Sequence, residues 1–308
     1  MRIVFFGSPD FAVPSLAALA EEHEIAAVVT QPDRPAGRGA KLQMPPVKTF
    51  AQEKGLAVLQ PSKLRDGQLA KQLAGLAPDV VVVVAYGRIL PPDLLAVPRL
   101  GAWNVHASLL PKLRGAAPIQ WAIIRGETST GVSIMRMEEG LDTGPVAAQA
   151  PEPIAPTDTT GTVSGRLAKL GARLLAETLP EIARGSVSLR EQDASLATLA
   201  PPLSKSEGKL DFRQSASVVS ARARGVDPWP GATATLKEEV AKLFGPTVVA
   251  GTGAPGEFLG LIPQGLAVAC GDGAVAFAEV QLPGRKRMPA QALLAGHPIR
   301  PGAVLGSG

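Results

Sequence analysis

Cysteine is almost absent from this chain of 308 residues, which contains Cys270 and no other. A single thiol cannot form an internal disulfide, and it cannot supply a thiolate-rich zinc site. Histidine is also rare, with three residues, and no H-E-x-x-H motif or paired Cys/His cluster occurs in the sequence. The sequence therefore implies no bound metal ion, and its cysteine usage fits a reducing cytoplasm.

Long hydrophobic runs are missing as well. The N-terminal segment MRIVFFGSPDF reaches Asp10 before any long apolar run develops, so we interpret it as a buried first strand and not as a secretory signal. The run Val80–Ala85 is too short to span a bilayer, and we expect a cytoplasmic protein with no membrane partner. No G-x-G-x-x-G motif follows the first strand, which argues against a nicotinamide cofactor.

The net charge is small and positive, at +4, and the chain is 45% hydrophobic and 19% charged, as in an ordinary globular protein. Residues 205–308 carry three of the four excess positive charges. A basic excess favours polyanionic partners such as nucleic acid. Charge alone nevertheless favours the simpler interpretation, a mildly basic solvated surface.

Short apolar runs alternate with helix-like segments over the first half of the chain. The runs predict strands at Arg2–Phe6, Ile25–Thr30, Val80–Ala85, Ala102–His106 and Gly131–Met137. The intervening segments predict helices, three of which open with proline, at Pro14–Glu22, Pro46–Lys54, Gly67–Leu76 and Pro118–Arg125. This alternation predicts an α/β fold with a doubly wound, mostly parallel sheet. Ligands of such sheets bind at the carboxyl ends of the strands, where Gly7, Asn104 and His106 fall.

The second half of the chain has a different pattern. A long amphipathic helix is predicted at Gly161–Ala183, and the polar, proline-containing run at 191–204 is interpreted as a linker. A short helix at Ala216–Arg224 comes next. Short runs broken by glycine and proline then predict the strands of a small β-barrel, at Thr233–Leu236, Val240–Phe244, Val248–Ala250, Glu257–Leu261, Leu266–Ala269 and Ala274–Gln281.

Three polar side chains between Ala102 and Gly144 could carry acyl chemistry. Asn104 and His106 are two residues apart in a predicted strand, so they share one face and can both reach one developing oxyanion. Asp142 lies in a loop between two predicted strands, and its carboxylate could orient His106 if the loop folds back. The alternatives are a structural histidine and an aspartate that merely caps its own turn, LDTG.

Two basic segments could contact a phosphate backbone. Arg34, Arg38 and Lys41 lie in the polar loop at 31–46, beside glycines that would allow a close approach. Lys286 stands between two arginines, one of them Arg287, in the densest basic cluster of the chain. A flexible surface loop and a solvated hairpin tip are the respective alternatives.

The segment SLLPKLRGAAPIQWAIIRGETSTGVSIMRMEEGLDTG resembles the signature of the folate-dependent formyltransferase family. Further resemblance lies in FFGSPDFAVPSLAAL, QPDRPAGRGAKL, VVVVAYGRILP, LSKSEGKLDF and DPWPGA, so that it covers essentially the whole chain. Asn104, His106 and Asp142 match the Asn–x–His pair and the distal aspartate of the family. The loop at 31–46 and the C-terminal barrel narrow the resemblance to members that formylate initiator methionyl-tRNA.

The resemblance implies a Rossmann-like formyltransferase domain at 1–190, a linker at 191–204 and an OB-like tRNA-binding barrel at 205–308. It implies transfer of a formyl group from 10-formyltetrahydrofolate, the co-substrate, to the α-amino group of methionine on initiator tRNA, by direct attack and without a metal. Catalysis would fall to Asn104, His106 and Asp142, and the protein would act as a monomer. The implied folate contacts are Arg88, Ile89, Leu90, Ser108, Leu109, Leu110 and Pro111, and the implied tRNA contacts are Arg34, Arg38, Lys41, Lys286 and Arg287.

Three rival functions stay open at this point. A formyltransferase that acts on an amino sugar or an amino-ribonucleotide would share the Asn–x–His pair and the aspartate. A non-catalytic RNA-binding protein on an α/β scaffold would leave the grouping of these residues to chance. A hydrolase that releases formate would use water in place of the amine.

Overall fold

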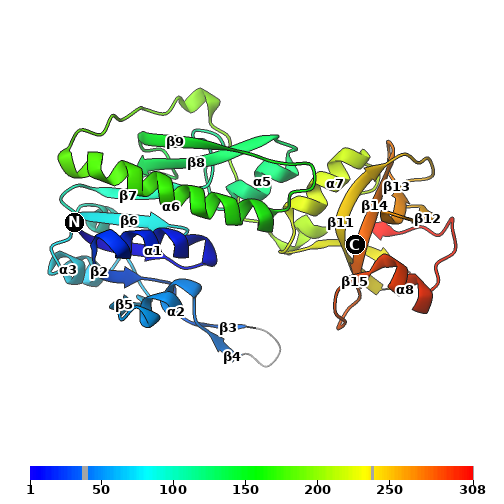
Figure 1. The fold of residues 1–308 in the computed structure, drawn as a ribbon, viewed down its shortest axis with the longest axis horizontal. Helices are drawn as coiled ribbons and strands as arrows, with labels where there is room; N and C mark the ends of the chain where they lie inside the picture. Colours follow the sequence, from blue (N-terminus) through cyan, green and yellow to red (C-terminus); the bar gives the residue numbers. More distant parts are fainter. Residues whose placement is uncertain (37–40, 237–238, 308) are drawn as a thin grey trace. The chain divides into compact units, whose positions relative to one another are not determined.

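The computed structural model describes residues 1–36, 41–236 and 239–307, and the chain divides into two compact units (Figure 1). Unit 1 comprises Met1–Pro118, Thr130–Glu152 and Ser164–Pro201. Unit 2 comprises Ile119–Ser129, Pro153–Val163 and Pro202–Gly308. The predicted domain limits at 190 and 205 stay predictions, because compactness alone does not define a functional domain.

A seven-stranded sheet forms the centre of unit 1, in the order β5-β2-β1-β6-β7-β8-β9. The five strands from β5 to β7 are parallel, and β8 runs antiparallel to β7. The strands are β1 (Arg2–Gly7), β2 (Glu24–Val29), β5 (Val58–Leu59), β6 (Val80–Val84), β7 (Ala102–His106), β8 (Ser129–Arg136) and β9 (Val146–Pro153). Every residue of β6 is buried, as expected for a strand covered on both faces.

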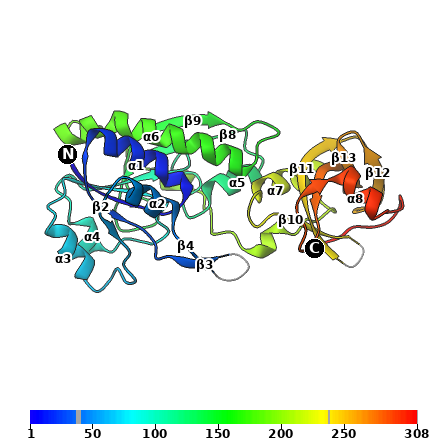
Figure 2. The same ribbon diagram turned by 60° about the horizontal axis from the view of Figure 1, so that its bottom comes forward.

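Helices cover both faces of this sheet, which confirms the predicted doubly wound fold. Helices α1 and α6 lie on one face, and α3 and α4 lie on the other (Figures 1 and 2). No helix among the described residues is long and apolar enough to cross a membrane. The helices that begin in the first 184 residues are α1 (Val13–Glu22), α2 (Pro46–Glu53), α3 (Gln68–Ala74), α4 (Pro92–Leu95), α5 (Pro118–Ile124) and α6 (Thr160–Arg184).

The strand order reverses between β1 and β6. From β1 the chain builds outward through β2 to β5 and then returns to the other side of β1 to form β6 and β7. Ligands of open α/β sheets bind at the carboxyl ends of the strands that flank such a reversal. Gly7 ends β1 there, and a Cβ on it would lie 2.8 Å from Ala12 Cβ and 3.0 Å from Val84 O. Glycine suits this turn because the side chain of Ala12 and the backbone of Val84 leave no room for a Cβ.

The polar segment predicted as a loop at 31–46 contains a short antiparallel hairpin, which the sequence pattern did not predict. Strand β3 (Arg34–Ala36) pairs with β4 (Lys41–Gln43). Backbone pairing compensates for the low strand propensity of these residues. Asp33, which precedes the hairpin, accepts a 2.6 Å hydrogen bond from Lys48 Nζ and a 2.7 Å bond from Gln60 Nε2.

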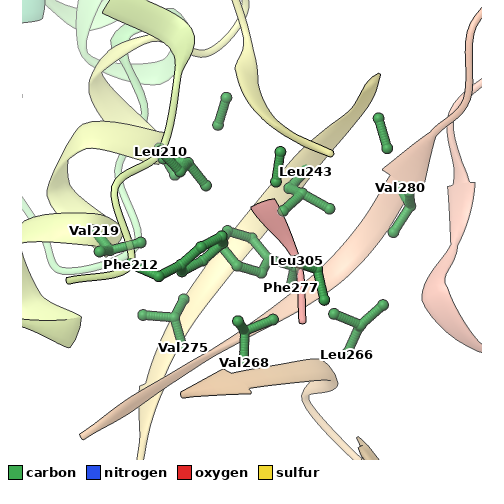
Figure 3. Close-up of a cluster of buried hydrophobic side chains, with 14 of the residues drawn as sticks. Leu210, Phe212, Val219, Leu243, Leu266, Val268, Val275, Phe277, Val280 and Leu305 are labelled. Atoms are coloured by element: carbon green, nitrogen blue, oxygen red, sulfur yellow. The ribbon is translucent and has the colours of Figure 1, made fainter. Parts of the chain in front are cut away.

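An antiparallel sheet forms the centre of unit 2, in the order β12-β13-β14-β11-β10-β16, with β15 paired to β14. This strand arrangement is compatible with the predicted OB-like barrel. Its core includes Phe212 and Phe277, whose rings meet edge to face at 6.5 Å (Figure 3). The elements are α7 (Ala216–Gly225), β10 (Ala232–Leu236), β11 (Glu239–Val249), β12 (Phe258–Ile262), β13 (Gly265–Ala269), β14 (Ala274–Gln281), β15 (Met288–Pro289), α8 (Ala290–Gly296) and β16 (Gly306–Ser307).

Strand β11 corrects the sequence prediction, which placed two strands on either side of Gly245 and Pro246. The two are one continuous strand. Gly245 absorbs the bend with a φ of 60°. The pairing of β10 with β11 ends at Leu243, so at Pro246 β14 is the one described strand that pairs with β11. Proline is tolerated where a strand has a free side, because its missing N–H breaks no second ladder.

Cys270 directly follows β13 and is 5% exposed. Burial raises the pKa of this thiol to about 11. Because the thiolate is the reactive form, we predict that Cys270 does not react with a disulfide reagent in the native protein at mildly alkaline pH. The same reagent should modify one thiol per chain after unfolding in denaturant. Rapid reaction of the native protein would contradict this placement of Cys270.

Candidate active site

Strand β7 brings Asn104 and His106 to the same face of the sheet, as the two-residue spacing predicts. Val105, between them, faces the opposite way, against α6: a Cβ on Gly171 of that helix would lie 2.8 Å from Val105 Cγ1. The buried valine therefore fixes the rotation of the strand. Its two polar neighbours must then point away from α6.

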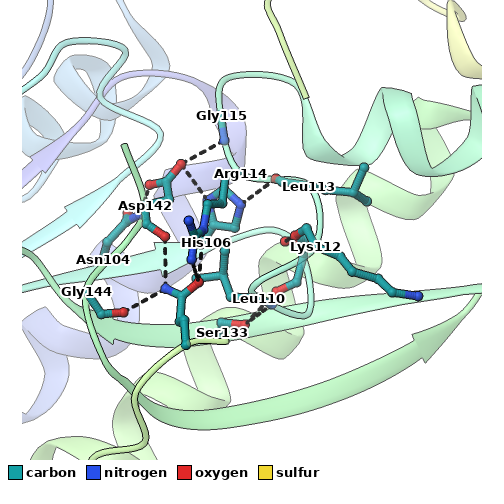
Figure 4. A network of polar contacts seen from close by, with 12 residues as sticks. Asn104, His106, Leu110, Lys112, Leu113, Arg114, Gly115, Ser133, Asp142 and Gly144 are labelled. Atoms are coloured by element: carbon teal, nitrogen blue, oxygen red, sulfur yellow. Dashed lines mark hydrogen bonds and ion pairs between the residues drawn. The ribbon is translucent and has the colours of Figure 1, made fainter. Parts of the chain in front are cut away.

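The side chains of Asn104, His106 and Asp142 converge (Figure 4). Asn104 Nδ2 donates a 3.4 Å hydrogen bond to Asp142 Oδ1. His106 Nδ1 lies 3.7 Å from Asp142 Oδ2. The side chains of His106 and Asp142 are 6% and 15% exposed, so both are largely withdrawn from solvent. Partial desolvation strengthens the electrostatic interaction between such groups.

The two ring nitrogens of His106 have different partners. Nε2 lies 3.0 Å from the carbonyl oxygen of Leu113. Because a carbonyl can only accept, Nε2 carries a hydrogen, and Nδ1 is the basic nitrogen of the neutral ring. The basic nitrogen therefore faces Asp142. This arrangement can accept a proton at Nδ1 and stabilise the resulting imidazolium with the carboxylate.

Asp142 is held in place by groups outside its own turn. Its Oδ2 accepts a 2.8 Å hydrogen bond from Gly115 N, and its backbone is left-handed, with a φ of 53°. The loop that carries it closes at Gly144, where a Cβ would lie 1.9 Å from Arg136 O. The carboxylate thus bonds to residues distant in sequence and does more than cap the LDTG turn.

The residues predicted to contact folate lie in two segments near the strand ends. Ser108 and Leu110 are buried, and their polar groups bond internally: Ser108 Oγ donates to Lys112 O at 2.6 Å, and Leu110 N donates to Ser133 Oγ at 3.0 Å. Leu109 and Pro111 are half-buried. A ligand beside this segment would meet the side chains of Leu109 and Pro111 before those of the buried pair.

The second segment, after β6, offers one exposed apolar side chain. Arg88 Nη1 donates to Ser62 O at 3.0 Å, and Leu90 is 4% exposed within an apolar cluster. Ile89, between them, is 65% exposed. Leu141, next to Asp142, is also half-exposed, at 50%, and nothing in the sequence pattern indicated it as a site residue. A single leucine in a loop, such as Leu141, belongs to no periodic pattern, so the sequence gives no signal that it could meet a ligand.

The basic residues predicted to contact tRNA have different environments. Arg34 and Lys286 are exposed, and Lys41 is the first residue of β4. Arg38 lies outside the described residues. Arg287 Nε donates to Glu279 Oε2 at 2.7 Å, and its guanidinium lies 4.1 Å from the centre of the Phe244 ring. Its charge is therefore already paired inside unit 2.

Within the described ranges, no group of three or more histidine, cysteine or acidic side chains is arranged to hold a metal ion. The converging groups of the site are one amide, one imidazole and one carboxylate. These three provide a hydrogen-bond donor, a base and a charge partner, which are the components of acid–base catalysis at an acyl carbon.

Family models match both parts of the chain. The Formyl transferase model matches residues 1–179, and the Formyl transferase C-terminal domain model matches residues 202–298. The chain belongs to the formyl transferase family. A methionyl-tRNA formyltransferase from Citrifermentans bemidjiense is 47% identical over 99% of this chain and 96% of its own length. One from Myxococcus xanthus is 49% identical over 98% of this chain and 97% of its own length.

Solved structures share the fold at lower identity. An N-formyltransferase from Helicobacter canadensis, in complex with folinic acid and dTDP-3-aminofucose, aligns with a TM-score of 0.68 and 17% identity, over 90% of this chain and 99% of that one. HypX from Aquifex aeolicus, in complex with tetrahydrofolic acid, aligns with a TM-score of 0.67 and 19% identity over 96% of this chain. This chain spans about half of HypX, 47% of its length.

The close approach at Gly144 predicts a steric requirement for glycine. Gly144→Ala should lower the free energy of unfolding by more than about 1 kcal/mol, because the new methyl group would overlap the Arg136 carbonyl. Gly165→Ala is the matched control: nothing lies within 4 Å of its added Cβ in α6, so alanine should stabilise the helix by about 1 kcal/mol. Denaturant unfolding measures both. Equal stability of the two variants would contradict the described loop.

Proposed function

We propose that this protein transfers the formyl group of 10-formyltetrahydrofolate to the α-amino group of methionine on initiator methionyl-tRNA. The observation that carries the proposal is the convergence of Asn104, His106 and Asp142 in a formyl transferase chain. Relatives named methionyl-tRNA formyltransferase, at 47% and 49% identity, support the tRNA substrate over an amino sugar.

In the proposed reaction the neutral amine attacks the formyl carbon directly. A bond forms between the amine nitrogen and the formyl carbon, and the bond from that carbon to N10 of the folate breaks. Negative charge develops on the formyl oxygen, and Asn104 Nδ2 is the neutral donor that stabilises it. His106 Nδ1 accepts the proton that the amine loses and delivers it to N10. No covalent enzyme intermediate forms.

Asp142 acts on His106 and not on the substrate. Its carboxylate lies 3.7 Å from Nδ1, where it stabilises the imidazolium that exists between the two proton transfers. The Leu113 carbonyl holds Nε2 and thereby keeps Nδ1 as the nitrogen that takes part. Both interactions favour the same ring orientation.

The co-substrate and the tRNA have separate proposed contacts. The folate contacts are residues 88–90 and 108–111, near the carboxyl ends of β6 and β7. The tRNA contacts are Arg34, Arg38 and Lys41 of the segment at 31–46, with Lys286 and Arg287 of unit 2. Because Arg287 is paired with Glu279, we assign Lys286 the larger share of the phosphate attraction there.

The remaining sequence-based expectations belong to the same proposal. A formyltransferase domain at 1–190, a linker at 191–204 and a tRNA-binding domain at 205–308 divide the work between catalysis and RNA binding. A charged initiator tRNA as substrate implies action in the cytoplasm. One chain supplies all three catalytic groups, which supports activity as a monomer. Incubation with 10-formyltetrahydrofolate and initiator methionyl-tRNA, followed by analysis for formylmethionine, tests the proposal.

The roles of His106 and Asn104 predict different losses. His106→Ala should abolish turnover, and Asn104→Ala should lower kcat by about 100- to 1,000-fold, because each loses a group that acts in the transition state. Tetrahydrofolate affinity, measured by titration calorimetry, should change little in both. The control is His23→Ala, which changes a histidine distant in sequence from the site and should keep the wild-type turnover. Parallel loss of folate affinity and turnover would count against the catalytic roles.

The proposed role of the segment at 31–46 predicts an effect confined to tRNA. Arg38→Ala should raise the KM for methionyl-tRNA much more than the KM for folate, because it removes a phosphate contact. The slope of log KM for tRNA against log salt concentration should also fall by about 1. Steady-state kinetics at several salt concentrations measure both. Arg65→Ala, at an exposed arginine outside the hairpin, is the control, and an unchanged tRNA KM in Arg38→Ala would refute the contact.

A further inference from the structure

The segment from Arg190 to Ala200, which we call the strap, is bonded to both loops of the catalytic site. At one end, Arg190 and Val146 exchange two backbone hydrogen bonds of 2.9 Å, just beyond the Asp142 loop. At the other end, Arg114 N donates to Thr198 O at 2.8 Å, and Ala200 N donates to Arg114 O at 2.7 Å. Sequence composition describes this segment as a linker, yet its backbone pairs with the catalytic loops.

Gln192 of the strap makes four hydrogen bonds with one amide group. Its Nε2 donates to Asp142 O at 2.9 Å and to Gly144 O at 2.7 Å. Its Oε1 accepts from Arg114 Nε at 3.1 Å and from Arg114 Nη2 at 2.8 Å. Two N–H groups and two lone pairs are all that a primary amide offers, so its capacity is saturated.

The two partners of Gln192 are the segments that hold the catalytic groups. Arg114 stands between Leu113, whose carbonyl contacts His106 Nε2, and Gly115, whose N–H contacts Asp142 Oδ2. Thr198 Oγ1 of the strap also accepts the Leu113 N–H at 2.9 Å. Asp142 is thus held at its backbone carbonyl by Gln192 and at its carboxylate by the N–H of Gly115.

We propose that Gln192 is a positioning residue, which fixes the Asp142 loop against the Leu113–Gly115 segment and so sets the distance from Asp142 to His106. The inference rests on the proposed function, which gives Asp142 and His106 their roles. The four hydrogen bonds of the Gln192 amide go to neither of these catalytic side chains. It acts through the backbone of one loop and the guanidinium beside the other.

A primary amide of this length is the group that fits the position. Glutamate would keep the bond to Arg114 but would place a carboxylate against two carbonyl oxygens. Methionine matches the length of glutamine and lacks all four hydrogen bonds. Both substitutions leave partly buried polar groups of the loops without the partner that Gln192 supplies, which loosens the site.

The test compares Gln192→Met with Glu191→Met, the same side chain at the exposed neighbouring position of the strap. In Gln192→Met, kcat for formyl transfer should fall by about 100-fold with little change in the KM for folate or tRNA, because misplacement affects the transition state most. Glu191→Met should keep the wild-type kcat. Arg114→Met removes the guanidinium that bonds to Gln192 Oε1 and should reproduce the loss of kcat.

A double-mutant cycle separates positioning from general stability. If Gln192 acts through Asp142, adding Gln192→Met to Asp142→Asn should lower kcat far less than it does in the wild-type chain. Additive losses, or a loss that appears in KM and not in kcat, would overturn the proposal. The cycle with Arg114→Met keeps the proposal falsifiable if Gln192→Met does not fold.

Amide hydrogen exchange reports the position of the Asp142 loop without a measurement of turnover, because the Gly115 N–H bonds to Asp142 Oδ2. In Gln192→Met the Gly115 amide should exchange about tenfold faster, the equivalent of one hydrogen bond, and in Glu191→Met it should exchange at the wild-type rate. Unchanged Gly115 exchange in Gln192→Met would overturn the positioning role. If the wild-type chain shows no formyl transfer but Gly115 exchanges faster in Gln192→Met, the proposed function is refuted. The positioning of the Asp142 loop by Gln192 is then still supported.

Discussion

The position of one carboxylate is the constraint on which the rest of the site depends. Asp142 accepts hydrogen bonds from Asn104 and Gly115 and lies 3.7 Å from the basic nitrogen of His106. A carboxylate in this place orders an amide donor and an imidazole base around one point without covalent chemistry. Moving it would leave Asn104 and His106 on their strand but remove the negative charge beside His106 Nδ1, which in the proposed reaction stabilises the imidazolium. The loop that carries Asp142 therefore needs support from elsewhere in unit 1.

The three side chains of the site are held by two parts of unit 1 that differ in rigidity. The parallel sheet holds Asn104 and His106, because β7 is hydrogen-bonded on both sides and Val105 packs toward α6. Asp142 lies in an irregular loop and depends on single contacts, which are the Gly115 N–H, the close approach at Gly144 and the amide of Gln192. Precision in loops comes from such specific hydrogen bonds, because a loop has no regular ladder of its own.

Electrostatics in this protein is local. A net charge of +4 on 308 residues exerts a weak overall field, so attraction for a tRNA backbone must come from particular cations. Fewer cations can attract a phosphate than the number of basic residues suggests, because Arg287 is paired with Glu279 and Arg114 is bonded to Gln192. Exposed residues such as Arg34 and Lys286 keep a charge that a phosphate can reach. This distinction between paired and exposed cations appears only in the folded chain.

The sequence by itself determined five of the seven strands of the sheet in unit 1, most of the helices there and the placement of Asn104 and His106 on one face, because these depend on local periodicity; it did not predict β5 and β9. It also selected Asp142, through its loop between two strands and through family resemblance. Tertiary structure alone decided that β11 runs through Pro246, that the segment at 31–46 forms a hairpin, and that Gln192 joins the two catalytic loops. Those features depend on which strand or loop lies alongside, and contacts between residues 50 or more positions apart leave no periodic pattern in the chain.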